Sequence, residues 1–332
     1  MKKFLLFLLF FIIIIGIGMY FYLPGYLSTS SNDTDIEVKV EPGASLSSVA
    51  DDLFKKDIIR SKLWFRYQGQ DIAKKIKPGT YTFTPDLKLE DIYEILQKGE
   101  QEEAIVVTIP EGFILYQIAN RVAEAGFGTV EDFVEETNAY FTKNKYTFDT
   151  ANLYFNMEGY LFPDTYHFTK KQTVTEIVSL LANTMSNIFT DEYKSRAEEL
   201  GLTTHEVITL ASLIEREAYN DEERAKISGV IHNRIKKNML LQIDATVIYG
   251  LGEGKEHMTR VLNADLKIDN SFNTYKNTGL PPGPIASPGK NSIHAALYPE
   301  EHKYFYYVMG ENGHIFSETY KEHLSNIAKY RK

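Results

Sequence analysis

The sequence Thr209-Leu-Ala-Ser-Leu-Ile-Glu-Arg-Glu-Ala218 places two carboxylates at the end of an otherwise apolar segment. Upstream of it, Thr203 can cap a helix, and Glu206 is an acidic residue of the kind that favours a first turn. No proline or glycine follows before Asn220. The pattern therefore predicts one uninterrupted helix through this stretch.

The two carboxylates of this helix differ in their surroundings. At about 100° per residue, Leu210, Leu213 and Ile214 share one side of the helix. Glu217 projects near the middle of the same side, whereas Glu215 points roughly at right angles to it. An apolar setting raises the pKa of a carboxyl group, as a general acid near neutral pH requires. The alternative is that Glu217 turns out to water at the helix end, and spacing alone favours this second interpretation.

The composition excludes several kinds of site. The chain has 332 residues, enough for more than one domain, with 45 acidic against 36 basic residues and no cysteine. The lack of cysteine excludes disulfides, thiolate metal sites, a cysteine nucleophile and a lipid-modified cysteine. Basic residues form only short lysine pairs, so nucleic acid is not expected as a partner. The 22 tyrosines and 20 phenylalanines suit a large core and also sugar-stacking surfaces.

The N-terminus predicts a membrane anchor. Residues 4–23 form an apolar run long enough to cross about 30 Å of hydrocarbon. Lys2 and Lys3 precede the run and acidic residues follow it, which predicts a cytoplasmic N-terminus and an extracytoplasmic remainder. A cleaved signal peptide is the alternative, but the run is long and the Ser-Thr-Ser after it is a poor cleavage site. We therefore expect a single-pass anchor in residues 1–27 and a polar linker in 28–35.

Residues 36–135 contain two copies of a strand-turn-helix pattern. Val40-Glu-Pro-Gly43 and Ile109-Pro-Glu-Gly112 are each followed by apolar residues at the same helical spacing. Such units resemble LysM-like modules, which bind the glycan of peptidoglycan, and a structural spacer is an equally good interpretation. For the first copy and its continuation we expect strands at 36–40 and 80–84 and helices at 45–53, 61–68 and 89–96.

Residues 151–332 are predicted to form an α+β catalytic domain, so that the whole chain has an α+β fold. Proline and glycine are dense between Gly279 and Gly289, and apolar positions bracket them, which predicts a rigid loop. The other elements expected are helices at 173–200 and 221–238, a strand at 303–308 and a final helix from 317.

The usual catalytic motifs are absent from the sequence. Histidines are scattered, so no metal site is predicted, and no glycine loop ends in Gly-Lys-Ser/Thr. No G-x-S-x-G elbow is present, and prolines keep Ser287 and Lys290 out of the helical turn that a serine-lysine pair needs. No cofactor is expected. What remains is carboxylate chemistry, with Asp164, Glu215, Glu217 and Asp244 as candidates.

Five segments resemble, in order, the motifs of one family, the endolytic murein transglycosylases or YceG-like proteins. They are EGYLFPDTY at 158–166, LASLIERE at 210–217, VIHNRI at 230–235, LQIDATVIYG at 241–250 and NTYKNTGLPPGPI at 273–285. The likeness covers essentially the whole chain, including the N-terminal apolar run and the LysM-like region. In that family the catalytic residue is the second glutamate of the Glu-x-Glu pair, which is Glu217 here.

The resemblance implies cleavage of the β-1,4 bond between N-acetylmuramic acid and N-acetylglucosamine in peptidoglycan glycan strands. The product would carry a 1,6-anhydromuramyl end, and one glutamate would act first as acid and then as base. This scheme departs from the two-carboxylate glycosidase mechanism. The implied partners are glycan strands, the membrane and cell-wall synthases.

Further residues of these motifs are expected to bind substrate or support Glu217. They are Ser212, Glu215, Asn233, Gln242, Asp244, Thr246, Tyr249, Asn273 and Tyr275. For Asp244 a second interpretation is the cap of a helix starting at Ala245. Two other functions stay open from the sequence: a hydrolytic muramidase with Asp244 or Glu215 as second carboxylate, and a non-catalytic glycan-binding scaffold of cell-wall synthesis.

Overall fold

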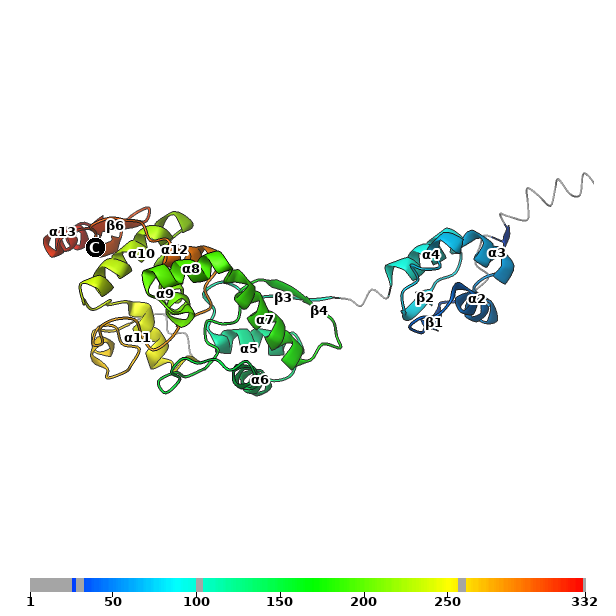
Figure 1. The fold of residues 1–332 in the computed structure, drawn as a ribbon, viewed down its shortest axis with the longest axis horizontal. Coiled ribbons are helices and arrows are strands. Elements are labelled where there is room, and N and C mark those ends of the chain that lie inside the picture. Colours follow the sequence, from blue (N-terminus) through cyan, green and yellow to red (C-terminus); the bar gives the residue numbers. More distant parts are fainter. Residues whose placement is uncertain (1–25, 28–32, 100–103, 256–260, 331–332) are drawn as a thin grey trace, which may run out of the picture. The chain divides into compact units, whose positions relative to one another are not determined.

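The computed structural model describes residues 26–27, 33–99, 104–255 and 261–330, and its chain divides into two compact units, Met1–Glu103 and Ala104–Lys332 (Figure 1). The expected anchor at residues 4–23 lies outside the described residues. Within the described part, no helix is both long enough and apolar enough to span a membrane.

The first unit has a strand-helix-helix-strand-helix order. Its elements are β1 (Ile36–Val40), α2 (Leu46–Lys55), α3 (Lys62–Gln68), the short 3-10 helix η1 (Gln70–Ile72), β2 (Gly79–Phe83) and α4 (Leu89–Lys98). The strands pair antiparallel, with Ile36 opposite Phe83 and Val40 opposite Gly79. Alternate residues of each strand are buried, so one face of the ribbon packs against the helices. The predicted strands and helices of this region are thus confirmed to within a few residues.

The second copy of the repeat has the same local structure but belongs to the other unit. It consists of β3 (Ile105–Thr108), α5 (Leu115–Glu124) and α6 (Val130–Lys143). The turn glycines of the two copies adopt nearly the same left-handed conformation, with φ of 79° at Gly43 and 77° at Gly112. Strand β3 pairs antiparallel with β4 (Thr165–Phe168), far along the chain.

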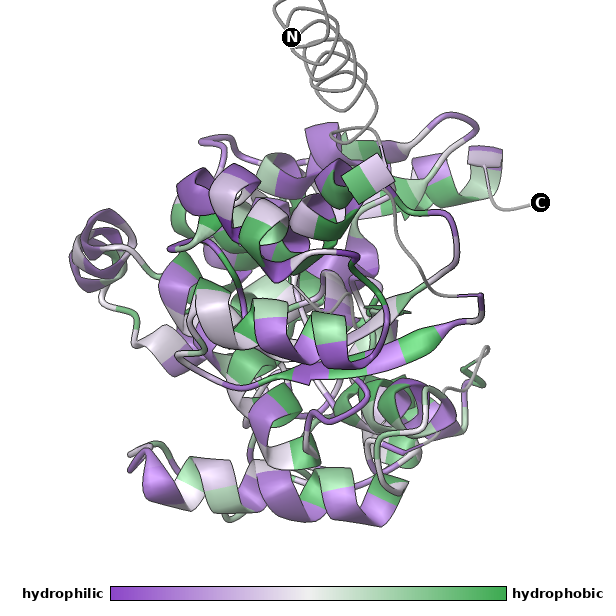
Figure 2. Ribbon diagram, turned by 90° about the vertical axis from the view of Figure 1, so that its right-hand side faces the viewer, coloured by the Kyte–Doolittle hydropathy of each residue, from purple (hydrophilic) through white to green (hydrophobic). Residues whose placement is uncertain are grey.

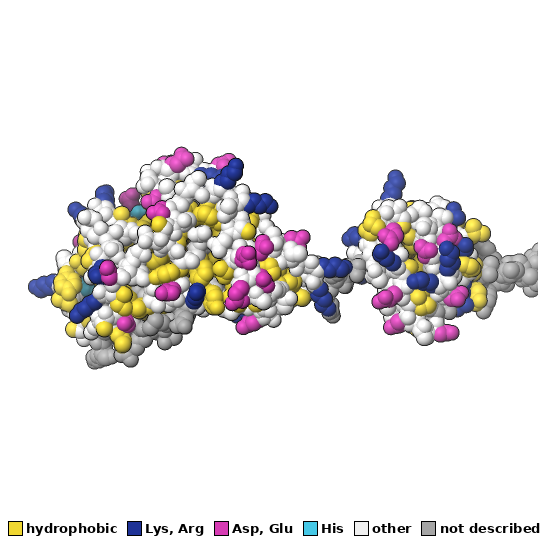
Figure 3. Space-filling model, turned by 90° about the horizontal axis from the view of Figure 1, so that it is seen from below, with side chains coloured by type: hydrophobic (Ala, Val, Ile, Leu, Met, Phe, Trp, Pro, Cys, Tyr) yellow, Lys and Arg dark blue, Asp and Glu magenta, His cyan; other side chains and the backbone are white. Residues whose placement is uncertain are grey.

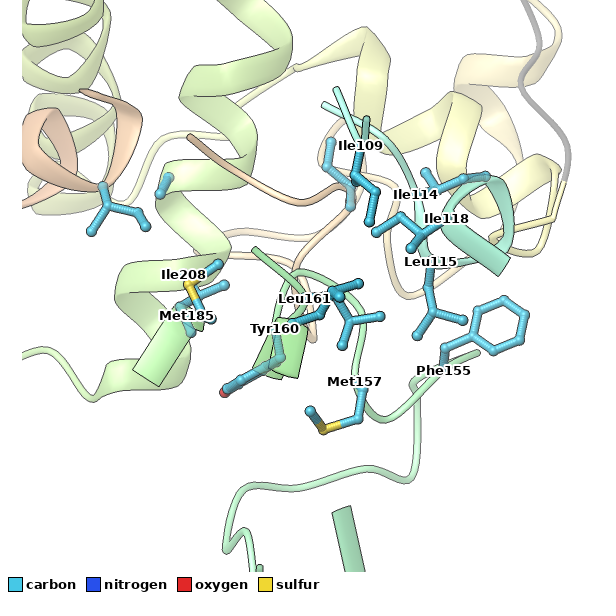
Figure 4. Packing of buried hydrophobic residues seen from close by; sticks show 14 of the residues in the cluster. Ile109, Ile114, Leu115, Ile118, Phe155, Met157, Tyr160, Leu161, Met185 and Ile208 are labelled. Carbon is cyan, nitrogen blue, oxygen red and sulfur yellow. The ribbon is translucent and has the colours of Figure 1, made fainter. Parts of the chain in front are cut away.

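The packing of the second copy moves the domain boundary from the predicted positions. The sequence interpretation grouped residues 36–135 and began the catalytic domain at 151, whereas the chain divides after Glu103. The reason is that the buried residues of α5 belong to the hydrophobic core of the second unit. Figure 4 shows this contact between Ile109, Ile114, Leu115 and Ile118 on one side and Phe155, Met157 and Leu161 on the other.

The region predicted as one helix at 173–200 is two helices. Helix α7 (Val174–Ile188) begins after a capping box between Thr173 and Glu176, and α8 (Asp191–Leu200) begins after Thr190. The Thr190 hydroxyl accepts a hydrogen bond from Tyr193 N at 3.3 Å, so it caps a new helix where the spacing alone indicated continuity. Gly201 ends α8 in the left-handed region.

Helix α9 (Thr204–Glu217) is the centre of the larger unit. It contacts α8, α10 (Asp221–Lys236), α11 (Asp244–Leu251) and α12 (Lys290–Leu297). Many helices of the protein carry hydrophobic and hydrophilic residues side by side (Figure 2). In α9, by contrast, every residue from Val207 to Ile214 is buried. The helix start at Thr203 and Glu206 is confirmed by a reciprocal capping box.

The C-terminal part is a hairpin followed by a helix. Strands β5 (Tyr306–Met309) and β6 (His314–Ser317) pair antiparallel, and α13 (Tyr320–Tyr330) packs against both. The strand and the helix each start about three residues later than predicted. In Figure 1, β6 and α13 lie beside α10, and His314 of β6 bonds Glu223 of α10 with 2.7 Å between Nδ1 and Oε2.

The proline-glycine loop between Gly279 and Gly289 is fixed by hydrogen bonds, as its composition predicted. Ser287 exchanges two backbone hydrogen bonds with Gly112 and Phe113 of the repeat turn. Ile285 N donates to the Ser212 hydroxyl of α9 at 3.0 Å. The loop therefore joins the repeat to the central helix. A short 3-10 helix, η2 (Asp265–Lys267), precedes it.

Candidate active site

A cavity of about 350 Å³ opens at the C-terminal end of α9, where Glu217 is the last helical residue. Four of the residues predicted for the site line it: Glu217, Gln242, Asp244 and Tyr275. The rest of the lining comes from Arg234, Leu241, Tyr307, Val308, Met309, His314, Tyr320, His323 and Ile327. The structure thus brings together α9, α10, the start of α11, the hairpin and α13.

The carboxyl group of Glu217 accepts a hydrogen bond from a phenol instead of pairing with a cation. The Tyr307 hydroxyl donates to Glu217 Oε2 at 2.8 Å. Burial raises the pKa of Glu217 to about 7; the bond from Tyr307 lowers this pKa, and the nearby charge of Asp244 raises it. Glu217 is therefore near half-protonation at neutral pH, which suits a group that must give and then take a proton.

Tyr307 is itself held in place by burial and by its neighbours. Burial raises the pKa of its hydroxyl well above the usual range, so it stays a neutral donor. Its ring meets the His314 ring edge-on, with centroids 5.2 Å apart. Because Glu223 binds both the backbone N and the ring of His314, the hairpin is fixed to α10.

Asp244, Tyr275 and Gln242 form a second polar group in the cavity. The Tyr275 hydroxyl donates to Asp244 Oδ1 at 2.5 Å. Asp244 is the first residue of α11 and its carboxylate does not cap that helix, so the alternative role given to it does not apply. Gln242 has a φ of 53°, uncommon for a side-chain-bearing residue, and its backbone N donates to Thr274 O at 3.1 Å. Such conformations persist where the surrounding structure imposes them, often at functional sites.

Arg234 connects the two sides of the cavity and was not predicted. Its Nε donates to Phe305 O at 2.6 Å, and one terminal nitrogen donates to Leu240 O and Leu241 O at 3.1 and 2.7 Å. The same guanidinium therefore holds the strand that carries Tyr307 and the turn that carries Gln242. It also places a positive charge in the cavity wall, where it lowers the pKa of Glu217.

Glu215 faces away from this cavity. Its Oε1 accepts from Arg224 at 3.0 Å and its Oε2 accepts from Gly289 N at the same distance, with only 7% of the side chain exposed. The difference from Glu217 is therefore not burial, as the stripe argument assumed, because α9 is surrounded on all sides. The difference is the partner: Glu215 forms an ion pair with Arg224, whose side chain is 11% exposed, whereas Glu217 accepts a hydrogen bond from a phenol.

Several predicted site residues are structural. Asn233 donates to His302 O and Tyr304 O at 2.9 and 3.0 Å, so it holds the segment that leads into β5. Ser212 is fully buried between α9 and the proline-glycine loop. Thr246 and Asn273 are also buried: Thr246 bonds Thr274 with 2.9 Å between hydroxyl oxygens, and Asn273 bonds the backbone of the 266–275 turn. None of the four lines the cavity.

Tyr249 binds a second buried carboxyl group, that of Glu158. Its hydroxyl donates to Glu158 Oε2 at 3.1 Å, and Leu115 N donates to Oε1 at 2.9 Å. Burial raises the pKa of Glu158 to about 8. This glutamate resembles Glu217 in burial and in its phenol partner, but it links α5 to α11 in the core and does not line the cavity.

The described residues hold no cluster of three or more histidine or acidic side chains that could bind a metal ion. On the face shown in Figure 3, lysine and arginine side chains are scattered among aspartates and glutamates, without a basic stripe.

Comparison with known proteins identifies the family of the chain. Residues 38–329 match the sequence model of the YceG-like family. A protein of Bacillus subtilis named endolytic murein transglycosylase is 36% identical, over 96% of this chain and 91% of its own length. The chain belongs to the YceG-like family. The resemblance recognised in the sequence motifs is thereby confirmed.

Two further proteins are similar to this member of the YceG-like family. An endolytic murein transglycosylase of Streptococcus pneumoniae is 28% identical over 99% of this chain, which corresponds to 65% of the relative's length. The crystal structure of a YceG-like protein from Listeria monocytogenes superposes with a TM-score of 0.61, at 30% identity, covering 89% of this chain and 99% of that one.

Proposed function

We propose that this YceG-like protein is a peptidoglycan lytic transglycosylase that cleaves glycan strands internally, with Glu217 as its acid and base. The observation that carries the proposal is Glu217 at the cavity wall, with a pKa raised to about 7 and a hydrogen bond from the neutral Tyr307 hydroxyl. Family membership supports the same activity, since the relatives are named endolytic murein transglycosylases.

The proposed reaction needs no net proton supply. Protonated Glu217 gives its proton to the glycosidic oxygen, and the bond from that oxygen to C1 of N-acetylmuramic acid breaks. The resulting carboxylate then takes the proton of the C6 hydroxyl of the same sugar, whose oxygen forms the new bond to C1. Glu217 ends protonated, and the product carries a 1,6-anhydro ring.

Tyr307 and Asp244 have opposite parts in this scheme. The Tyr307 hydroxyl stabilises the carboxylate form that exists between the two proton transfers. The charge of Asp244 adds to the effect of burial and raises the pKa of the resting acid, and the same charge favours an oxocarbenium-like sugar in the cavity.

A hydrolytic muramidase is the second candidate, favoured by one observation: Asp244 is another carboxylate in the same cavity. In that mechanism Asp244 would activate water or attack the sugar. Glu215 is not a candidate for this role, since it binds Arg224 and Gly289 outside the cavity.

Digesting purified peptidoglycan with the protein and weighing the products separates these functions. Lytic cleavage gives anhydromuramyl ends, which are one water lighter than the reducing ends that hydrolysis gives. Anhydro products are expected. Reducing ends would favour the muramidase, and intact glycan would favour a non-catalytic scaffold.

The dependence of kcat/KM on pH should identify the acid. Because Glu217 must be protonated in the free enzyme, kcat/KM should fall as the pH rises through about 7. Tyr307→Phe removes a bond that lowers the pKa of Glu217, so this fall should move to higher pH. Asp244→Asn removes a charge that raises the pKa, so the fall should move to lower pH. Shifts in the same direction for both variants would contradict the assignment.

We also propose that the protein is a single-pass membrane protein whose catalytic unit is extracytoplasmic, and that the LysM-like first unit holds it on glycan or near its synthases. The support is the apolar run at residues 4–23 with lysines before it, and the strand-helix-helix-strand order of the first unit. Mass spectrometry of the membrane-extracted protein should find the intact N-terminus. A mature terminus near Ser28 would contradict the anchor.

A further inference from the structure

We propose that Tyr320 of the C-terminal helix is a sugar-stacking residue that extends the binding site for the glycan strand beyond the scissile bond. The inference rests on the proposed function for the identity of its ligand, an N-acetylated hexose of the glycan. It assigns a substrate contact to a helix in which the sequence motifs indicated no role.

One face of α13 belongs to the cavity. Tyr320, His323 and Ile327 all line it, and their spacing of three and four residues places them on the same side of the helix. No described residue of α13 is fully buried, and the helix packs against β5 and β6. The helix therefore adds little to the core, while its inner side forms part of the cavity wall.

Tyr320 combines exposure with a fixed ring. Its residue is 59% exposed although it lines the cavity, so part of the aromatic surface is open to a ligand. Its ring lies 5.7 Å from the Tyr306 ring and 6.3 Å from the His323 ring, measured between centroids. These ring contacts restrict the side chain before a ligand binds, so less conformational freedom is lost on binding, which favours affinity.

The contacts continue inward to the catalytic centre. Tyr306 and His323 are stacked, with centroids 5.2 Å apart and planes at 23°. The guanidinium of Arg234, which lines the cavity, lies 5.2 Å from the Tyr306 ring centroid. A row of packed groups thus runs from the cavity wall near Glu217 to the exposed Tyr320.

The chemistry of the cavity favours a sugar as the ligand of this ring. A hexose has an apolar face of C–H groups that packs on an aromatic ring, and hydroxyl and amide groups that need hydrogen bonds. The cavity offers both kinds of partner: the open ring of Tyr320, and the polar side chains of Gln242, Asp244 and Tyr275. A flat, uncharged aromatic ring with a polar tip suits such amphipathic surfaces.

Three variants test the proposal on the full chain. Tyr320→Ala removes the ring and should raise KM for glycan strands about tenfold with kcat changed less than about twofold, as loss of uniform binding predicts. Tyr320→Phe keeps the ring and should behave like wild type. Leu324→Ala is the matched control, because Leu324 lies one turn away on the same helix, is 48% exposed and does not line the cavity. Thermal unfolding confirms that each variant is folded.

A binding measurement keeps this test independent of turnover. In the Glu217→Gln background, the affinity for purified uncleaved glycan strands is measured by calorimetry with and without Tyr320→Ala. A drop of about tenfold with Tyr320→Ala but not with Leu324→Ala supports the stacking role even if the protein proves not to cleave. An unchanged affinity and KM in Tyr320→Ala, or an equal loss in Tyr320→Phe, would overturn it.

Discussion

Replacing Glu217 by glutamine should leave the protein folded and able to bind glycan, while the release of anhydro-muropeptides falls by about 10²–10⁴-fold or more. The amide keeps the shape of the side chain and can still accept the hydrogen bond from Tyr307. It cannot donate or take a proton at neutral pH. Since the same group serves as acid and base in the proposed reaction, both proton transfers are lost together.

Glu158 supplies a matched control for this variant. Like Glu217, it has a raised pKa and accepts a hydrogen bond from a tyrosine hydroxyl, but it lies in the core outside the cavity. Glu158→Gln should therefore retain the rate of cleavage. Rates are measured from peptidoglycan digests analysed by mass. An active Glu217→Gln protein, or equal loss in both variants, would show that the reaction does not depend on Glu217 as its acid.

The same pKa predicts how Glu217→Gln affects stability. The pKa of Glu217 is higher in the folded protein, about 7, than its ordinary value of 4.5. The folded state therefore binds the proton more tightly, and the contribution of Glu217 to the free energy of unfolding falls as the pH rises from 4.5 to about 7. At pH values above this window, the glutamine variant should be at least as stable as wild type.

Local features of the sequence predicted the central helix well. Capping residues, the absence of helix breakers and the apolar run fixed its limits, because each acts through neighbours a few residues away. The equal turns of the two repeats were also predictable, since Gly43 and Gly112 each need the left-handed conformation. The domain boundary was not predictable, because the partner of a strand depends on the whole fold. Strand β3 pairs with β4, although α5 and α6 lie between them in the sequence.

Only part of the cavity lining at Glu217 was predicted from the sequence. Glu217, Gln242, Asp244 and Tyr275 lie in recognisable motifs, whereas Tyr307 lies on a strand that the sequence marks only as aromatic. The hydrogen bond between Tyr307 and Glu217 joins residues 90 positions apart, and a periodic sequence pattern cannot predict such a long-range contact.

Motif residues also include polar groups with structural roles. Asn233, Ser212 and Asn273 satisfy buried backbone groups, because leaving such groups unpaired costs about 1–3 kcal/mol each. Sequence patterns do not separate this role from substrate binding. The contacts of each side chain do so, since these three residues bond the protein backbone and do not line the cavity.

Replacing Glu215 by glutamine should lower the free energy of unfolding by about 3 kcal/mol while the folded protein keeps most of its activity. The side chains of Glu215 and Arg224 are only 7% and 11% exposed, and their atoms are 3.0 Å apart. Removing the negative charge leaves the guanidinium of Arg224 with only the exposed carboxylates of Asp221 and Glu111 as ion-pair partners. Activity should persist at low temperature, because Glu215 does not line the cavity. Urea unfolding and peptidoglycan digestion measure the two effects separately.

Asp221 offers a control for the effect of burial, because its exposed carboxylate binds the same guanidinium. Its carboxylate lies 2.7 Å from Arg224 Nε, closer than that of Glu215, but its side chain is 66% exposed. Water already screens this pair, so Asp221→Asn should cost no more than about 1 kcal/mol. If Asp221→Asn were as damaging as Glu215→Gln, distance and not burial would govern the strength of these pairs. If Glu215→Gln were stable but inactive, Glu215 would belong to the catalytic machinery after all.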